Sequence, residues 1–207
     1  MNSLLLNDLQ HVYKMRKNEI KNRLDEFSEP KSKGEVFMEM CFCLLTPQSN
    51  ARRCWDTILE LKKNELLYDG KEDSMINRMT GCRFHNTKAK YVVAVREKFD
   101  SIYEKIKTTE STQELREWLV QNVKGYGYKE ASHFMRNIGS RDVSILDRHI
   151  LRNMVKFGLL DEIPKTLTKK KYLEIEQKFF EFSKTVDIDP AELDLLIWSM
   201  QTGNVFK

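Results

Sequence analysis

The sequence is poor in glycine and proline, with 8 Gly and 4 Pro among 207 residues. A domain of this length would ordinarily hold about 25 of the two together, since Gly makes up roughly 7% and Pro roughly 5% of average chains. Both residue types mark turns, so their scarcity indicates long helices joined by few connections. Sandwiches and propellers are disfavoured, and no segment alternates as a strand would. We expect an all-α protein.

Long apolar runs are also missing. Residues 1–16 contain only the short run Leu4–Leu6, which is too little for a signal sequence or a membrane span. Hydrophobic residues at 41% and charged residues at 32% are typical of a soluble globular protein with one core or two small helical lobes. We expect an intracellular protein that does not contact membranes.

Cysteine is absent after position 82, and the four thiols Cys41, Cys43, Cys54 and Cys82 lie in the first half of the chain. This pattern favours free thiols in a reducing compartment. Cys41 and Cys43 would point to nearly opposite faces of a helix and cannot easily hold one metal ion. Cys82 and His85 could share a helix face, but the other histidines show no ligand spacing. We expect no metal and no cofactor.

The net charge is only +4, but the basic residues are concentrated. Residues 121–156 hold seven basic and three acidic side chains, an excess equal to that of the whole chain; the basic ones are Lys124, Lys129, Arg136, Arg141, Arg148, Arg152 and Lys156. A second basic stretch consists of Arg83, Lys88, Lys90, Arg96 and Lys98. Localised positive charge is typical of proteins that bind the DNA backbone, although a solvated helix face has the same composition.

Apolar residues recur at helical spacing along most of the chain. Thr46–Asn50 interrupts this pattern at Pro47, and Ser49 or Asn50 can cap the next helix. Asp189 and Pro190 have the order of a cap and a first helical residue. The expected helices cover residues 3–28, 36–45, about 50–66, a short stretch between 70 and 81, 86–107, 114–123, 129–138, 147–157, 167–186 and 190–200.

Two glycines, Gly125 and Gly127, lie two positions apart between predicted helices. They allow a tight turn and let amides at the start of the next helix approach an anion. A helix, a glycine hairpin and a second helix can therefore hold a DNA phosphate through backbone N–H groups. A turn without any ligand has the same composition.

Lys129 follows this hairpin in the first turn of the next helix, where the helix dipole and burial favour a neutral, nucleophilic amine. Eighteen residues later, the apolar segment Val143–Leu146 ends at Asp147, which heads another helix. Taken singly, Lys129 can be an ordinary surface lysine and Asp147 a simple helix cap.

Taken together, Gly125–Lys129 and Leu146–His149 resemble the hairpin and the catalytic-acid segment of the helix-hairpin-helix superfamily of DNA glycosylases. The resemblance implies that Lys129 attacks the sugar C1′, expels the base and forms a Schiff base that leads to β-elimination. It also implies that Asp147 stabilises the positive charge developing on the sugar and helps to take up the lysine proton.

Two other loops extend the resemblance. Leu44–Asn50 is similar to the turn that carries a polar residue, here Gln48, into the gap left by an extruded base. Gly81–Ala89 is similar to the loop whose apolar wedge, here Phe84, fills the stack beside the orphan base. The alternatives are a turn residue at Gln48 and a core aromatic at Phe84.

The lack of cysteine after position 82 excludes the iron–sulfur cluster of the endonuclease III branch. The short chain and its end, Trp198–Lys207, most closely resemble the compact archaeal-type 8-oxoguanine glycosylases. In that group the terminal lysine with its carboxylate helps to recognise the extruded base, and an aromatic of the last helix lies nearby. Lys207 and Trp198 match these positions, whereas a frayed tail without function is the alternative.

We therefore expect a bifunctional 8-oxoguanine glycosylase and lyase, monomeric and cytoplasmic, on the nucleoid of a prokaryotic-type cell. Its partner is double-stranded DNA that contains 8-oxoguanine or abasic sites. The expected lobes are residues 31–122, with the base-gap loops, and residues 1–30 plus 123–207, with the hairpin, the acid and the tail. The alternatives are a glycosylase/lyase for oxidised pyrimidines and a non-catalytic DNA-binding module.

Overall fold

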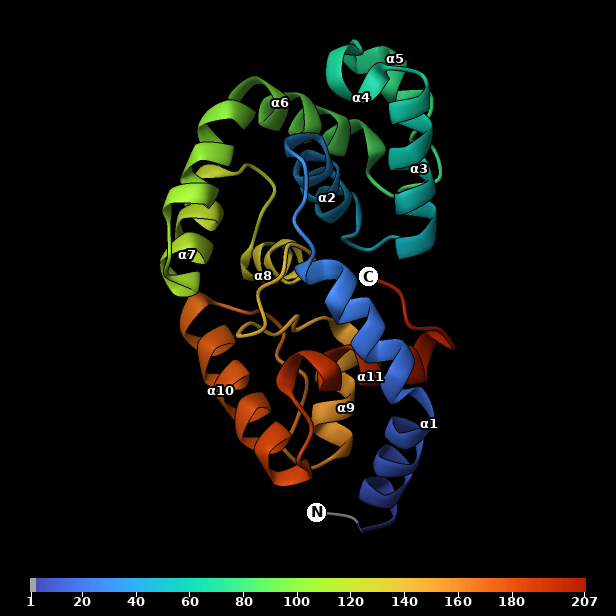
Figure 1. Cartoon of the computed structure of the whole chain (residues 1–207), viewed down its shortest axis with the longest axis vertical. Coiled ribbons are helices and arrows are strands. Elements are labelled where there is room, and N and C mark those ends of the chain that lie inside the picture. Colours follow the sequence, from blue (N-terminus) through green and yellow to red (C-terminus); the bar gives the residue numbers. More distant parts are fainter. Residues whose placement is uncertain (1–2) are drawn as a thin grey trace. The chain divides into compact units, whose positions relative to one another are not determined.

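The computed structural model describes residues 3–207, and these fold into helices joined by short loops, with no strand among them (Figure 1). The helices are α1 (Ser3–Ser28), α2 (Lys33–Leu45), α3 (Ala51–Lys63), α4 (Leu66–Asp69), α5 (Glu72–Ile76), α6 (His85–Thr108), α7 (Thr112–Asn122), α8 (Tyr128–Asn137), α9 (Arg148–Lys156), α10 (Lys169–Val186) and α11 (Pro190–Thr202). The all-α prediction is confirmed. In the described part of the chain, no helix is long and apolar enough to cross a membrane.

The helix boundaries follow local signals in the sequence. Asn50 caps α3 by accepting a hydrogen bond from the Arg53 N–H, and Asp189 caps α11, whose first residue is Pro190. Both caps agree with the prediction. The sequence pattern predicts a short helix only between residues 70 and 81. It therefore missed α4, a single helical turn that begins at Leu66 and ends before Gly70.

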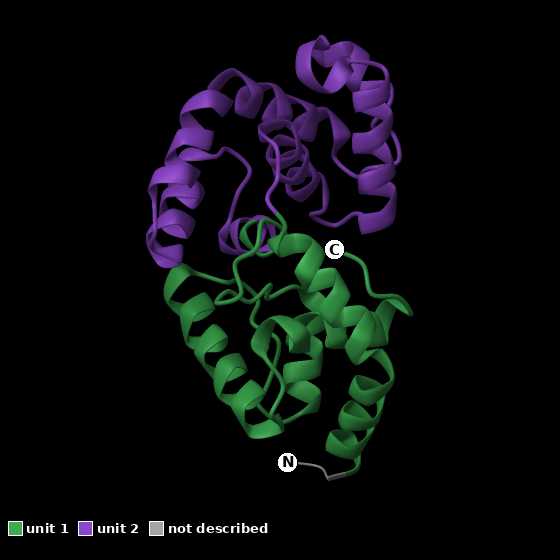
Figure 2. Ribbon diagram, in the orientation of Figure 1, with its two compact units in different colours: residues 1–29, 135–207 green, residues 30–134 purple. Residues whose placement is uncertain are grey.

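Two compact units make up the chain (Figure 2). Unit 2 is Pro30–Phe134, and its central element is α2, which is buried from Val36 to Leu45. Helices α3 and α6 both pack on α2. This explains why the sequence from Val36 to Leu45 is apolar nearly all round: this part of α2 has no face left for solvent.

Unit 1 consists of Met1–Glu29 and Met135–Lys207. Its core is built on α11, which packs against α1, α9 and α10. Helix α11 is buried from Ala191 to Ile197 and includes two buried carboxylates, Glu192 and Asp194. Glu192 accepts a hydrogen bond from the Tyr13 hydroxyl of α1, so the first helix of the chain is tied to the last.

The units differ from the lobes expected from the sequence in the place of the hairpin. The boundary falls within α8, after Phe134, so that Gly125, Gly127 and Lys129 belong to unit 2. Packing explains this assignment. The buried Tyr126 donates a 3.0 Å hydrogen bond from its hydroxyl to the Met40 carbonyl of α2, which anchors the hairpin to that helix.

Candidate active site

The two hairpin glycines have different structural roles. Gly125 has a φ of +95°, and a Cβ atom there would lie 2.5 Å from Cδ2 of Tyr91 and 3.0 Å from Cδ2 of Leu44. Both the backbone conformation and the close packing therefore require glycine at this position. Gly127 is not among the described glycines with positive φ, and a Cβ atom at Gly127 would lie 3.2 Å from a carboxylate oxygen of Glu130.

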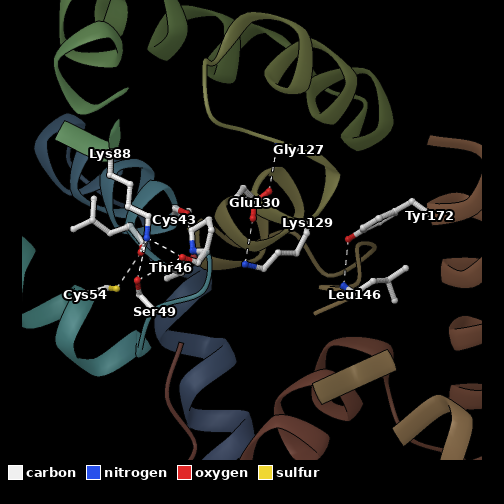
Figure 3. A network of polar contacts seen from close by, with 12 residues as sticks. Cys43, Thr46, Ser49, Cys54, Lys88, Gly127, Lys129, Glu130, Leu146 and Tyr172 are labelled. Atoms are coloured by element: carbon white, nitrogen blue, oxygen red, sulfur yellow. Dashed lines mark hydrogen bonds and ion pairs between the residues drawn. The ribbon is translucent and has the colours of Figure 1, made fainter. Parts of the chain in front are cut away.

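Lys129 and Glu130 lie side by side in the first turn of α8 (Figure 3). The Lys129 Nζ is 3.3 Å from Oε1 of Glu130, and both side chains are largely buried, with 24% and 13% of their surface exposed. The other Glu130 oxygen accepts a 3.1 Å hydrogen bond from the Gly127 N–H, as in a capping box. A phosphate that bound this N–H would have to displace the carboxylate.

The segment before Asp147 is buried, irregular backbone held by side chains. The Ser144 N–H donates to Glu176 at 3.0 Å and the Ile145 N–H donates to Asp194 at 3.0 Å. The Tyr172 hydroxyl donates a hydrogen bond to the Ser144 carbonyl at 2.6 Å. The same hydroxyl accepts a hydrogen bond from the Leu146 N–H at 3.3 Å (Figure 3). Three consecutive amides are thus satisfied by α10 and α11, which allows this non-helical segment to be buried.

Asp147 caps α9 with a single oxygen atom. Its Oδ1 accepts hydrogen bonds from the backbone N–H groups of His149 and Ile150, at 2.7 and 2.9 Å. These bonds fix the orientation of the carboxylate at the positive end of the helix, where its negative charge is stabilised. Asp147 itself is only partly buried. One oxygen is therefore committed to the fold, and the carboxylate lies at a partly accessible position.

Asp194 lies beneath this segment and is fully buried next to Arg136. Burial raises the pKa of Asp194 to about 6, although the Arg136 guanidinium and the hydrogen bond from Ile145 favour the charged form. Arg136 is 3.6 Å from the carboxylate and also lies over the Phe27 ring at 5.0 Å. This buried pair joins α8 and α11 to the backbone that precedes Asp147.

Gln48 and Phe84 share an unusual backbone conformation. Their φ angles are +55° and +58°, and only two other described non-glycine residues, Glu65 and Asp187, have positive φ. Both side chains are exposed, and Phe84 has 57% of its surface in solvent. The core alternative for Phe84 is therefore wrong. A left-handed conformation costs free energy at a non-glycine residue and is concentrated at functional sites.

The carboxy-terminal tail is packed onto α11. Val205 is buried, and the Phe206 ring stacks on the Trp198 ring with a centroid distance of 6.5 Å. Lys207 is partly buried. The expectation that Val205 and Phe206 anchor the tail agrees with this packing.

The basic stretches are only partly a surface feature. Lys124, Arg148, Arg152 and Lys156 are exposed, as a charged DNA-binding face requires. Arg136 and Lys88 are buried and contribute to the interior instead. Lys129 and Arg141 form ion pairs, with Glu130 and Asp25. The charge count in the sequence therefore overstates the positive charge that is free for DNA.

The structure groups the site residues predicted from the sequence into two sets. Unit 2 carries Gln48, Phe84, Gly125, Gly127 and Lys129. Unit 1 carries Asp147, Trp198 and Lys207. No group of three or more His, Cys, Asp or Glu side chains suited to a metal ion occurs among residues 3–207.

Comparison with known proteins decides the family. Residues 20–188 match the Ogg-HhH family, described as 8-oxoguanine DNA glycosylase. The chain belongs to this family. It is 44% identical to the 8-oxoguanine DNA glycosylase/AP lyase of Fusobacterium nucleatum, over 97% of each chain. It is 40% identical to the protein of the same name from Methanocaldococcus jannaschii, over 96% of this chain and 99% of the relative.

Solved structures of this glycosylase family have the same fold. The Methanocaldococcus jannaschii 8-oxoguanine glycosylase/lyase in complex with a 15mer DNA containing 8-oxoguanine is 37% identical, with a TM-score of 0.91 over 99% of this chain and 100% of that one. The 8-oxoguanine DNA glycosylase of Thermotoga maritima gives a TM-score of 0.90 at 32% identity, over 98% of each chain. The resemblance inferred from the sequence motifs is confirmed.

Sequence reasoning missed the residues that hold the glycosylase motifs in place. Glu130 is visible in the sequence as a Glu in the first turn after a glycine, which is half of a capping signal. Asp194 and Lys88 gave no signal of their own, because an acid or a lysine is expected at the surface unless its partners are known.

Proposed function

We propose that this protein excises 8-oxoguanine from duplex DNA and then cleaves the backbone at the resulting abasic site. The observation that carries the proposal is the Lys129 amine, on the first turn after the glycine hairpin, in a chain of the 8-oxoguanine glycosylase family. The relatives from Fusobacterium nucleatum and Methanocaldococcus jannaschii are both named 8-oxoguanine DNA glycosylase/AP lyase. The double activity in that name requires an amine nucleophile.

Lys129 is the proposed nucleophile. Its unprotonated Nζ attacks C1′ of the damaged nucleotide, the bond from C1′ to the base breaks, and the base leaves with the bonding electrons and takes up a proton. Loss of the amine proton and opening of the sugar ring give a Schiff base. Removal of a proton from C2′ then expels the 3′ phosphate by β-elimination. Partial burial of Lys129 favours this chemistry by limiting access of water to the amine.

Asp147 is the proposed assisting acid. Attack at C1′ develops positive charge on the sugar, and a carboxylate held in place stabilises that charge more in the transition state than in the ground state. Its cap on α9, through Oδ1, supplies the fixed orientation. The same carboxylate is suited to take up the proton that the lysine amine loses.

Base recognition is proposed for the tail. 8-Oxoguanine has a hydrogen-bond donor at N7 where guanine has an acceptor, so an acceptor aimed at N7 selects the lesion. We assign this role to Lys207 with its carboxylate, and stacking near the base to Trp198, whose ring is held by Phe206. Deletion of Lys207 should reduce the preference for 8-oxoguanine over guanine more than it reduces affinity for DNA. Equal losses would reject the role.

DNA contacts outside the base pocket are proposed for four residues. Gly125 and Gly127 bring the hairpin backbone to a phosphate, Gln48 fills the gap left by the extruded base, and Phe84 wedges into the stack beside the orphan base. The exposure of Gln48 and Phe84 supports the last two roles. We also place the protein in the cytoplasm, in contact with chromosomal DNA, because its relatives come from bacteria and archaea.

Borohydride trapping tests the mechanism. Incubation with a duplex that contains 8-oxoguanine should give a covalent adduct for the wild type and none for Lys129→Gln. A duplex that contains an oxidised pyrimidine should trap far less wild-type protein. The mechanism is rejected if no adduct forms with the wild type, or if an adduct of equal yield survives Lys129→Gln.

A further inference from the structure

Lys88 is a buried lysine, with 4% of its surface exposed, near the start of α6. Its Nζ donates to the Leu45 carbonyl at 2.6 Å, to the Pro47 carbonyl at 2.8 Å and to the Ser49 hydroxyl at 3.0 Å (Figure 3). Burial is the main cause that lowers the pKa of Lys88. An ammonium group has three N–H donors, so these bonds use all of them, and none is left for a DNA phosphate.

The three acceptors surround Gln48 along the chain. Leu45 is the last residue of α2, and its carbonyl lies at the negative end of that helix, where a cation is stabilised. Pro47 and Ser49 are the two neighbours of Gln48. The ammonium group therefore pulls both sides of the turn toward the protein while the Gln48 side chain is exposed.

The same lysine is linked to the loop that carries Phe84. The Lys88 N–H donates to the Phe84 carbonyl at 3.0 Å, which is the first hydrogen bond of α6. The Ser49 hydroxyl, already bound to Lys88, accepts a 2.9 Å hydrogen bond from the Arg83 N–H. Two loops more than 30 residues apart in the chain are thus joined within unit 2 by Lys88 and Ser49.

We propose that Lys88 is a positioning residue that holds Gln48 and Phe84 in their exposed, left-handed conformations, ready to enter a base pair as it opens. Left-handed backbone at a non-glycine residue persists only where the surroundings enforce it. The hydrogen bonds of the Lys88 ammonium group hold the backbone on both sides of Gln48 in place. The hydrogen bond from the Arg83 N–H to Ser49 and the first hydrogen bond of α6 hold the backbone at Phe84. The inference rests on the proposed function, because it assumes that these two side chains act on the opened base pair.

Excision rates on paired and unpaired lesions distinguish a positioning role of Lys88 from a general effect on stability. Opening a normal pair requires unstacking and unpairing, and fixed intruding side chains offset that cost. If the lesion faces an abasic-site analogue, no partner base has to be separated from it, and less depends on the intruding residues. Loss of positioning should therefore slow excision of a paired lesion far more than excision of an unpaired one.

The experiment compares single-turnover excision by the wild type and by Lys88→Met on two duplexes. In one duplex 8-oxoguanine faces cytosine, and in the other it faces a tetrahydrofuran abasic analogue. We expect Lys88→Met to lose about tenfold or more on the first and about threefold or less on the second. Lys90→Met, an exposed position two residues away, removes the same charge and should leave the ratio of the two rates unchanged.

A milder variant guards against misfolding. Ser49→Ala removes only the hydroxyl shared by Lys88 and Arg83 and should change the ratio in the same direction, by a smaller factor. If Lys88→Met lost the same factor in excision rate on both duplexes, or lost nothing on either, the inference would be overturned and the proposed function would remain intact. Failure of the wild type to excise 8-oxoguanine from both duplexes would instead reject the proposed function.

Discussion

The Asp194 carboxylate accepts a 3.0 Å hydrogen bond from the Ile145 N–H and so supports buried backbone just before Asp147. Because this carboxylate is buried, the fold depends on its protonation state. This hydrogen bond also links α11, which carries Asp194, to the backbone that positions the proposed assisting acid.

Asp194 should make stability depend on pH. Its pKa is raised to about 6 by burial, whereas an aspartate in the unfolded chain titrates near pH 4. The folded state therefore holds this proton more tightly than the unfolded state does. The folded protein loses stability as the pH rises from about 4 through about 6. Relative to Asp194→Asn, the free energy of unfolding of the wild type should fall by about 2 to 3 kcal/mol between about pH 4 and pH 7. Urea titrations measure this, and a difference that stays constant contradicts it.

Two substitutions of Asp147 should separate its proposed role in catalysis from its role as the cap of α9. Asp147→Asn keeps an oxygen that accepts from the His149 and Ile150 N–H groups, so stability should change by less than about 0.5 kcal/mol, while excision falls by about 10²-fold or more. Asp147→Ala should lose the activity and also about 1 kcal/mol of stability. Thermal unfolding and single-turnover excision measure the two effects. Equal stability of Asp147→Asn and Asp147→Ala would show that a neutral oxygen acceptor at this position does not stabilise the helix.

Gly125 should tolerate no side chain. In Gly125→Ala the new Cβ meets Tyr91 and the backbone stays left-handed, so we expect a loss of about 2 kcal/mol or more. Gly127→Ala is the matched variant in the same hairpin and should cost less than about 1 kcal/mol. Urea unfolding of the two proteins tests this difference. Equal stability of the two variants would contradict the packing argument.

Glu130 should be more important for stability than for chemistry. Glu130→Gln keeps an acceptor for the Gly127 N–H and removes the ion pair with Lys129, whereas Glu130→Ala loses both. Only the alanine variant should be destabilised, by about 1 kcal/mol. The ion pair must break before the amine attacks, so borohydride trapping by Glu130→Gln should be as fast as in the wild type or faster. Trapping about tenfold slower would instead show that the carboxylate takes part in the reaction.

Much of the fold followed from local sequence signals. Pro47 and Pro190 mark a break and a start between helices, and the caps at Asn50 and Asp189 are local chemistry. The spacing of apolar residues predicts one helix over residues 3–28, and α1 covers them. These features depend on neighbours within a few positions, which is why periodicity and capping rules find them.

The remaining features depend on distant parts of the chain. The sequence places Lys88 in a basic stretch, but its side chain is buried because it binds acceptors about 40 residues earlier. The membership of the hairpin in unit 2 depends on Tyr126 reaching Met40, 86 positions away. Motif spacing predicts which residues act, whereas the contacts that hold these residues are visible only in the folded structure.

The four buried thiols, Cys41, Cys43, Cys54 and Cys82, all belong to unit 2, and Trp198 is the tryptophan of unit 1. The chain therefore carries built-in reporters of different kinds in its two units. A thiol reagent can label the cysteines only when residues 30–134 open, because burial protects them in the folded protein. A single-tryptophan variant that retains Trp198 would report by fluorescence on unit 1. Labelling and fluorescence followed through one denaturant titration would reveal whether the two units unfold together or separately.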